Sequence, residues 1–246
     1  MMFLLLLTFS NSTPKTSQQD KEGFVQIFDG KTLRDWEGDP AYWRAENGCL
    51  VGEVTPTTIL KTNTFIIWRG GVTTDFELKG SFSITADGNS GINYRSEQLK
   101  DIPFALKGYQ ADIDGKIRYT GQNYEERGRT TLAYRGQKTT ITSQEDPQKP
   151  ESLNEYIRNN AWLGLNLTGT LGNTDSLRSL IKNEDWNEFH LIVKGNRLQH
   201  FVNGILMSDV TDNDNLNRKF SGLLGVQVHV GPPMKVQFKN LRIKKL

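Results

Sequence analysis

The chain of 246 residues is poor in cysteine and in clustered charge, and each shortage excludes a class of protein. Cys49 is the single cysteine, so an intrachain disulfide framework and a cysteine-cluster metal site are excluded, and we expect Cys49 to be a small core residue. The net charge is +2 and basic residues never run beyond two in succession, so no nucleic-acid partner is predicted.

The motifs of several common enzyme classes are also absent. The chain has no phosphate-binding glycine loop, dinucleotide fingerprint, HExxH sequence or nucleophile elbow. Phosphoryl transfer, hydride transfer and serine-type hydrolysis therefore have no support in the sequence. Histidines are few and scattered, and a satisfied structural role is expected for His190 and His200.

Long apolar runs are limited to the N-terminus, where residues 3–9 read FLLLLTF. The run is too short to span a bilayer and fits the hydrophobic region of a signal peptide, although no positive charge precedes it. We expect residues 1–21 to be a signal peptide with a polar tail and residues 22–246 to be one domain. A secreted or periplasmic protein without a membrane span is predicted.

Short strands separated by turns fill the chain from Phe24 onward. β-branched and aromatic residues alternate with polar ones, which is typical of half-buried strands, and dipeptides such as Asn203-Gly204 fit hairpin turns. This pattern predicts an all-β, antiparallel two-sheet sandwich. The predicted strand segments are 24–33, 49–54, 64–70, 76–84, 91–96, 109–114, 186–196, 198–210, 223–230 and 235–245.

Two short helical insertions are predicted between residues 135 and 185. Apolar residues at helical spacing follow Pro150, and a second run with Leu177 and Leu180 follows Thr174 or Asp175 as the cap. Neither helix is long enough to form its own core, so the region is interpreted as an elaboration of the sandwich. The polar insertion over 141–160 is not assigned a place.

Residues 109–129 hold the strongest candidate site. On the strand over 109–114, Gln110, Asp112 and Asp114 share one face while Ala111 and Ile113 share the other. A strand face with consecutive polar groups borders water or a ligand. The acidic and basic residues over 125–129 are interpreted as part of the loop that follows.

Aromatic residues accompany these polar groups and favour a sugar ligand. Tyr109, Tyr119, Tyr124 and Tyr134 lie near the carboxylates and amides of this stretch. Aromatic rings cover the C–H faces of sugars while fixed hydrogen-bonding groups contact the hydroxyls. His229 shares a strand face with Gln227 in GVQVHVG and repeats the polar alternation. Two such strands predict one groove.

The motifs FDGKTLRDW, WRGGVTTDFEL, NSGINYRS, GYQADID, YEERGR, DWNEFHLIVKGNRLQHFVNG and GVQVHVGPPMKVQFKNLRIKK occur in this order along the chain. In sequence and order they resemble the 3-keto-disaccharide hydrolase domain family from about Phe24 to the C-terminus. The resemblance implies a concanavalin A-like jelly roll with a concave sheet that binds sugar, and export in saccharide-degrading bacteria.

The resemblance also implies a set of site residues, taken position by position. Many members read Tyr-Glu-x-Gln where this chain has GYQAD, so Gln110 and Asp112 mark a subtype. The implied residues are Trp68, Arg69, Asn89, Asn93, Arg95, Tyr109, Gln110, Asp112, Tyr124, Glu125, Glu126, Arg129, Gln227 and His229.

The implied reaction is cleavage of a glycoside that is already oxidised at C3. The ketone acidifies the hydrogen on C2, so a base removes it, the enediolate expels the C1 oxygen, and water adds to the unsaturated sugar. Such chemistry needs a base, an acid and positive charge beside the enediolate. The candidate bases are Glu125 and Asp112, the candidate acids are His229 and Glu126, and the candidate stabilising cations are Arg95 and Arg129.

No cofactor is predicted. A divalent metal bound by His229 and carboxylates is an alternative to the arginine, but the sequence defines no ligand set for it. The remaining residues, Trp68, Arg69, Asn93, Tyr109, Gln110, Tyr124 and Gln227, are expected to bind the saccharide together with Arg129.

Two other functions stay open. A retaining glycosidase on the same fold would carry two glutamates flanking an aspartate on one strand, but here these positions are Gln110, Asp112 and Asp114, and glutamine can act neither as nucleophile nor as acid. A non-catalytic, lectin-like module would use the same groove without a base. The sugar, its linkage and the oligomeric state are not predicted.

Overall fold

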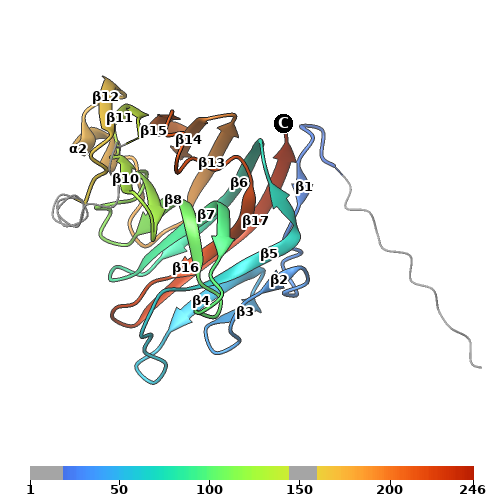
Figure 1. The fold of residues 1–246 in the computed structure, drawn as a ribbon. Helices are drawn as coiled ribbons and strands as arrows, with labels where there is room; N and C mark the ends of the chain where they lie inside the picture. Colours follow the sequence, from blue (N-terminus) through green and yellow to red (C-terminus); the bar gives the residue numbers. More distant parts are fainter. Residues whose placement is uncertain (1–18, 144–159) are drawn as a thin grey trace, which may run out of the picture.

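The computed structural model describes residues 19–143 and 160–246. Residues 1–18 of the expected signal peptide and the helix predicted after Pro150 lie outside the described residues, so both remain predictions. The described chain folds into two sheets packed face to face. Gathered at one end are β10 (Thr130–Ala133), β11 (Gln137–Ile141), β12 (Leu165–Thr170) and α2 (Thr174–Arg178) (Figure 1).

The larger sheet has ten strands. Its neighbouring strands are antiparallel except for one pair, since β11 and β15 run parallel. In order across the sheet the strands are β12 (Leu165–Thr170), β11 (Gln137–Ile141), β15 (Ile205–Asp212), β14 (Arg197–Val202), β13 (Asn187–Lys194), β6 (Phe76–Ile84), β17 (Met234–Lys245), β4 (Cys49–Val54) and β3 (Trp43–Glu46), with β1 (Val25–Gln26) paired to β17.

The smaller sheet has seven strands and carries the polar strand of residues 109–114 near its middle. In order they are β10 (Thr130–Ala133), β9 (Asn123–Glu126), β8 (Leu106–Asp114), β7 (Asn89–Gln98), β16 (Gly222–Val228), β5 (Thr64–Thr73) and β2 (Trp36–Glu37). The antiparallel two-sheet sandwich predicted from the sequence is confirmed.

Strands with clean alternation were predicted best. β4 and β6 have the predicted bounds, and along β6 each second residue is buried, beginning at Phe76. At the hairpin between β14 and β15, Asn203 and Gly204 have φ of 50° and 79°, the left-handed values that such a turn requires. Cys49 is buried, as expected.

The region from 123 to 178 differs from the prediction. Glu125 and Glu126 belong to strand β9 and not to a loop, so they point to opposite faces of the sheet. The strands β10, β11 and β12 were not predicted. The helix α2 (Thr174–Arg178) is confirmed, but its cap is Asn173, whose side chain accepts the N–H groups of Asp175 and Ser176. Among the described residues, no helix has the length and apolarity needed to cross a bilayer.

The main core lies between the two sheets, and a second, small apolar cluster lies on the outer face of the smaller sheet. Trp43, Phe82 and Phe238 are fully buried in the main core. The outer cluster consists of Phe65, Ile67 and Leu106, with Leu223 packed against it. The polar groups of that outer face lie towards β8 and β9, where they too are largely buried.

A buried ionic network ties β9 to the end of β15. The guanidinium of Arg129 donates to both oxygens of Glu125 (2.8 and 3.0 Å), to Asp212 (2.8 Å) and to Asp214 (3.2 Å). The Arg129 side chain is 3% exposed and both aspartates are fully buried. The hydroxyl of Tyr109 donates to Asp212 at 2.6 Å. One cation therefore compensates several buried carboxylates.

We expect Arg129→Met to lower the free energy of unfolding by about 3–5 kcal/mol, because removal of one partner leaves the buried carboxylates without their counter-ion. Urea denaturation at pH 7 measures the change. Arg44→Met is the matched control: its guanidinium is 42% exposed beside Glu46 and Glu53, so its loss should cost about 0–1 kcal/mol. Equal losses in the two variants would contradict a special role for the buried network.

Candidate functional site

A polar pocket opens on the outer face of the smaller sheet, beside the small apolar cluster. Its volume is about 130 Å³, below the usual range of pockets for drug-sized ligands. The side chains that line it are Asn89, Gln110, Asp112, Tyr119, Gln122, Tyr124, Glu126, Asn160 and His229.

The carboxylate of Asp112 accepts two side-chain hydrogen bonds in this pocket. Its Oδ1 accepts from Gln110 Nε2 at 2.6 Å, and its Oδ2 accepts from Gln122 Nε2. Asp112 lies opposite Gly91 on the neighbouring strand, and the Gln110 side chain lies over that glycine, where a Cβ would overlap it. Gly91 thus gives Gln110 the room to reach Asp112. The carboxylate is 8% exposed.

Burial raises the pKa of Asp112 to about 7. The two amide hydrogen bonds act in the opposite direction because they stabilise the charged form, while the negative charges of Glu126 and Asp114 raise the pKa further. Asp112 therefore gains and loses its proton near neutral pH. A carboxyl group with this property can act as a general base or a general acid.

His229 enters the pocket from the end of β16. Its Nδ1 lies 2.6 Å from the carbonyl oxygen of Val230, and because a carbonyl only accepts, Nδ1 carries the proton. In the neutral ring Nε2 is therefore the atom with the lone pair. The backbone N–H of His229 donates to Asn89, so the two pocket residues are joined through their main chains.

Glu126 reaches the pocket from β9. Its carboxylate accepts from Asn63 Nδ2 at 3.0 Å, and the guanidinium of Arg127 lies 3.7 Å away. Asn63 also accepts the N–H of Val230 through Oδ1. Asn63 therefore fixes Glu126 relative to the segment that carries His229.

Asp114 is a structural residue of the hairpin that follows β8. Its carboxylate accepts the backbone N–H groups of Arg118, Tyr119 and Thr120. It shares the strand face of Gln110 and Asp112, as predicted, but it orders the loop that delivers Tyr119 and Gln122. It does not line the pocket.

Glu125, Arg129 and Tyr109 lie on the opposite side of the sheet from Asp112. Tyr109 and Glu125 face each other across β8 and β9, and both join the interior ionic network. Burial raises the pKa of Tyr109 above its usual range, so its hydroxyl remains a donor. The predicted site residues are thus split by strand alternation, and Glu125 is not placed beside Asp112.

Arg95, expected on the same concave face as Asp112, does not lie there. A register irregularity follows Tyr94, and Arg95 has a φ of 47°, which removes it from the alternation of β7. Its fully buried guanidinium donates to Asp75 and to the carbonyls of Thr74 and Gly195. The prediction that Arg95 lines the groove is therefore wrong.

Trp68 and Arg69 also lie away from this pocket. Trp68 belongs to the main core and lines a different cavity, next to Asp29 and Arg34. Arg69 bonds Glu37 and Gln98 at the surface. The two residues are not brought together with Asp112.

Asn93 and Gln227 lie on the outer face but beneath its surface. Asn93 is opposite Gln110 in the β7–β8 register, and both Asn93 and Gln227 are fully buried. Their amide atoms have no hydrogen-bond partner within residues 19–143 and 160–246. They underlie the region between the pocket and the apolar cluster without lining the pocket.

Three pocket residues were missed by the sequence analysis: Gln122, Asn160 and the supporting Asn63. Gln122 had only a partial signal, because the Asp114-Gly115 dipeptide predicts that the chain reverses after residue 114 but not which residue returns beside Asp112. Asn63 and Asn160 reach the site from distant parts of the chain, and no local pattern marks them.

The described part of the chain contains no group of three or more His, Cys, Asp or Glu side chains arranged to hold a metal ion. No lysine or arginine lines the pocket within the same residues. The groups that can contact a developing negative charge there are amides, tyrosine hydroxyls and His229.

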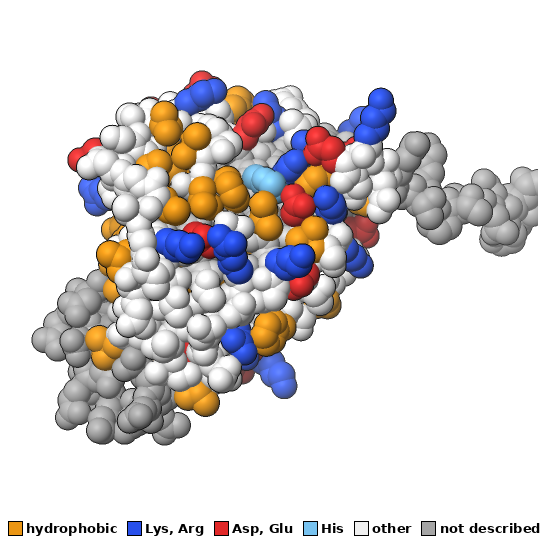
Figure 2. Space-filling model, turned by 90° about the horizontal axis from the view of Figure 1, so that it is seen from above, with side chains coloured by type: hydrophobic (Ala, Val, Ile, Leu, Met, Phe, Trp, Pro, Cys, Tyr) orange, Lys and Arg blue, Asp and Glu red, His pale blue; other side chains and the backbone are white. Residues whose placement is uncertain are grey.

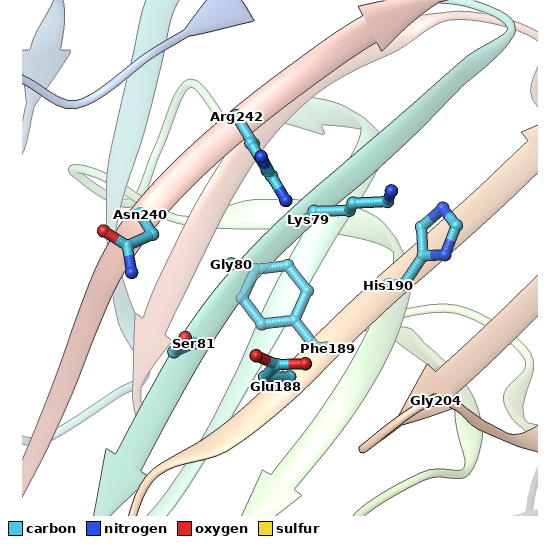
Figure 3. A pocket seen from close by; sticks show the side chains of 9 residues that line it. All are labelled: Lys79, Gly80, Ser81, Glu188, Phe189, His190, Gly204, Asn240 and Arg242. Carbon is cyan, nitrogen blue, oxygen red and sulfur yellow. The ribbon is translucent and has the colours of Figure 1, made fainter. Parts of the chain in front are cut away.

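A larger cavity, of about 250 Å³, lies on the outer face of the ten-stranded sheet (Figure 3). Its two cationic side chains already have partners, since Lys79 bonds Glu22 at 2.9 Å and Arg242 bonds Asp20 at 3.3 Å. His190 likewise bonds Glu77 at 2.8 Å. The smaller pocket is the better candidate because its polar groups converge. On the face shown in Figure 2, positive and negative side chains are interspersed.

Comparison with curated protein sequences gave no match. Among solved structures, a Parabacteroides distasonis protein described as a "putative glycosyl hydrolase" is similar at 22% identity with a TM-score of 0.57, over 94% of this chain and 100% of the other. The carbohydrate-binding module CBM66 from Bacillus subtilis is 15% identical with a TM-score of 0.52, over 86% and 96%. A Bacillus subtilis protein with a galectin-like fold is 11% identical with a TM-score of 0.51, over 87% and 90%.

These similarities confirm the predicted concanavalin A-like jelly roll. A family profile, the 3-keto-alpha-glucoside-1,2-lyase-like domain, matches residues 23–244, which is nearly the whole chain. Because the match spans both sheets and every strand that borders the pocket, the chain belongs to the 3-keto-alpha-glucoside-1,2-lyase-like domain family.

Proposed function

We propose that the protein cleaves 3-keto-glycosides by removing the C2 proton and expelling the C1 oxygen, with Asp112 as the base. Family membership supports the substrate class. The observation that carries the assignment to this residue is the burial of Asp112 at the pocket wall, which raises its pKa to about 7. Efficient proton transfer needs a base whose pKa lies near the working pH.

The C3 ketone explains why such a base suffices. A carbonyl next to C2 lets the electron pair of the broken C–H bond spread onto oxygen, and the enediolate then expels the glycosidic oxygen at C1. Gln110, Gln122 and the tyrosine hydroxyls supply neutral donors around the base. Donors fixed in a water-poor pocket stabilise developing negative charge.

The leaving oxygen needs a proton, and His229 and Glu126 are the two groups that line the same pocket and can supply it. A protonated His229 would donate through Nε2, since Nδ1 is held by Val230. Glu126 would donate from the opposite wall, where Asn63 holds it. Arg95 and Arg129 take no part, because both are bound inside the sandwich.

The arrangement of a retaining glycosidase on this fold, with both carboxyl groups on one strand, is not found on β8. It requires two carboxyl groups that act in turn on the sugar, and on β8 the flanking positions are Gln110 and Asp114. Gln110 cannot ionise, and Asp114 is occupied by backbone N–H groups of the hairpin. Activation through the C3 ketone avoids this requirement.

We expect Asp112→Asn to lower both C2 hydrogen exchange and cleavage of a 3-keto-glycoside by on the order of a hundredfold or more, because the amide cannot accept the proton. Glu126→Gln and His229→Gln are the matched pocket controls. Whichever of the two donates the proton should, when replaced, slow cleavage while C2 exchange continues. NMR in deuterium oxide records exchange and sugar release together.

Two results would decide against this proposal. Release of sugar from unoxidised glycosides, with no C2 exchange in any product, would favour the direct glycosidase. Tight saccharide binding with neither exchange nor cleavage of any 3-keto-glycoside would favour a lectin-like module.

Asp112 should also make stability depend on pH. Because its folded pKa is raised from 3.8 to about 7, the native state binds the proton more tightly than the unfolded state, so stability falls as pH rises through this window. Asp112→Asn removes that loss. Relative to wild type, the variant should gain up to about 4 kcal/mol between pH 4 and pH 8 by urea denaturation. A variant that loses relative stability over this range would show that the pKa of Asp112 is low.

We also propose that the chain is exported, because residues 3–9 form a short apolar run followed by a polar tail. Mass spectrometry of the protein from its native host should find an N-terminus well after Met1, in a secreted or periplasmic fraction. Intact protein in the cytosol alone would contradict this.

A further inference from the structure

His200 lies in the interior, on strand β14 of the larger sheet, yet it contacts the residue that holds Asp112 on the far face of the smaller sheet. The His200 side chain is buried, and its Nδ1 lies 3.2 Å from the carbonyl oxygen of Gln122. The side chain of Gln122 in turn donates to Asp112. The backbone carbonyl of Gln122 thus faces the core, and its side-chain amide faces the pocket.

The hydrogen bonds around His200 define its tautomer. The carbonyl of Gln122 only accepts, so Nδ1 carries the proton and Nε2 is the acceptor. Donors surround Nε2: the hydroxyl of Tyr94 at 2.8 Å and the amide of Asn123 at 3.2 Å. Burial lowers the pKa of His200 to about 4, so the ring is neutral at the pH where Asp112 titrates.

The backbone carbonyl of Gln122 that bonds His200 also takes part in the hairpin between β8 and β9. It also accepts the backbone N–H of Asp112, at 3.4 Å, and the N–H of Gln122 donates to Tyr119. Among the hydrogen bonds of the described residues, the His200 bond joins Gln122 to the larger sheet, and the other bonds of Gln122 lie within its own hairpin.

We propose that His200 is a positioning residue for Asp112 and acts through Gln122. The inference deepens the proposed function, on which its relevance to catalysis rests. His200 is not among the described residues that line the pocket. It fixes the carbonyl of Gln122, so that the Gln122 amide meets Asp112 Oδ2 and stabilises the carboxylate.

The test is the titration of Asp112 itself, followed by ¹³C NMR of labelled aspartate carboxyl groups, with the Asp112 signal assigned from its absence in Asp112→Asn. In His200→Phe, which keeps a ring of similar size, we expect the pKa of Asp112 to rise by about one unit, because a hydrogen bond to its charged form is weakened. The titratable groups that face Asp112 are Asp114, Tyr119, Tyr124, Glu126 and His229. These are unchanged in the variant.

Tyr94→Phe is the matched control, since it removes the hydroxyl that bonds His200 Nε2 and leaves the Nδ1 bond to Gln122. It should move the pKa of Asp112 by clearly less. A shift as large as that of His200→Phe would mean that general loosening of the core is responsible, and would overturn the proposal. So would the absence of any shift in His200→Phe.

A second comparison tests the route. In a Gln122→Leu background, which already lacks the amide, His200→Phe should add no further shift; an equal shift there would show that His200 does not act through Gln122. If His200→Phe folds poorly, His200→Asn and His200→Gln replace it. The Asn amide reaches the Nδ1 position and should keep the wild-type pKa, whereas the Gln amide extends past it and should not.

The titration is independent of turnover. A shift in the predicted direction in a protein that fails to cleave 3-keto-glycosides would support the role of His200 and refute the proposed function. Cleavage by wild type with no shift in His200→Phe would do the reverse. Where both hold, the acidic limb of the kcat/KM profile should move with the pKa of Asp112.

Discussion

The alternation of side chains along β8 and β9 is the constraint on which the site depends. Neighbouring residues in a strand point to opposite faces, so on β9 Glu125 points into the interior and Glu126 points into the pocket. On β8 the same rule separates Tyr109 from Gln110. The interior carboxylate of Glu125 bonds directly to Arg129, whereas the hydrogen-bond partners of the pocket carboxylates are side-chain amides, and Arg127 lies 3.7 Å from Glu126. One strand pair thereby creates a neutralised core network and an acidic, titratable pocket.

Burial acts in opposite directions on the two titratable groups that Gln122 links. It raises the pKa of Asp112 to about 7 and lowers that of His200 to about 4, because in each case the neutral form is favoured. For His200 the folded pKa is depressed, so its contribution to stability is complete above pH 6.5 and is lost as pH falls towards 4. For Asp112 the loss comes as pH rises. The contributions of His200 and Asp112 to stability therefore change in opposite directions with pH and partly offset each other. The hydrogen-bonded chain from His200 through Gln122 to Asp112 carries no charge until Asp112 ionises.

The sequence predicted the sandwich because strands such as β6 alternate strongly between buried and partly exposed residues, with apolar side chains on the buried face. The sequence did not predict strand β9, because the residue that points into the interior is Glu125 and no apolar alternation marks the strand. The compensating aspartates lie more than eighty residues further along the chain, so no local window reveals that Glu125 can be buried. The prediction for Arg95 was wrong for another reason, because its positive φ interrupts the alternation of side chains on which that prediction relied. Asp112 and His229 were identified because their strands are regular up to the site.

The composition of the pocket bears on the kind of chemistry that it can support. Among the described residues, no arginine or lysine lines the pocket. Neutral donors would therefore contact a leaving group or an enediolate. A bound anion would lie beside the carboxyl groups of Glu126 and Asp112. Such a site suits an uncharged sugar better than a phosphorylated or acidic one. It also favours a substrate that carries its own electron acceptor, because a carboxylate with a pKa near 7 is far too weak to remove an ordinary sugar C–H proton. In the proposed reaction a ketone at C3 supplies that acceptor, a substrate class that we infer from the family to which the chain belongs. The protein would then have to supply position and a suitably placed base, the parts that we assign to Gln110, Gln122 and Asp112.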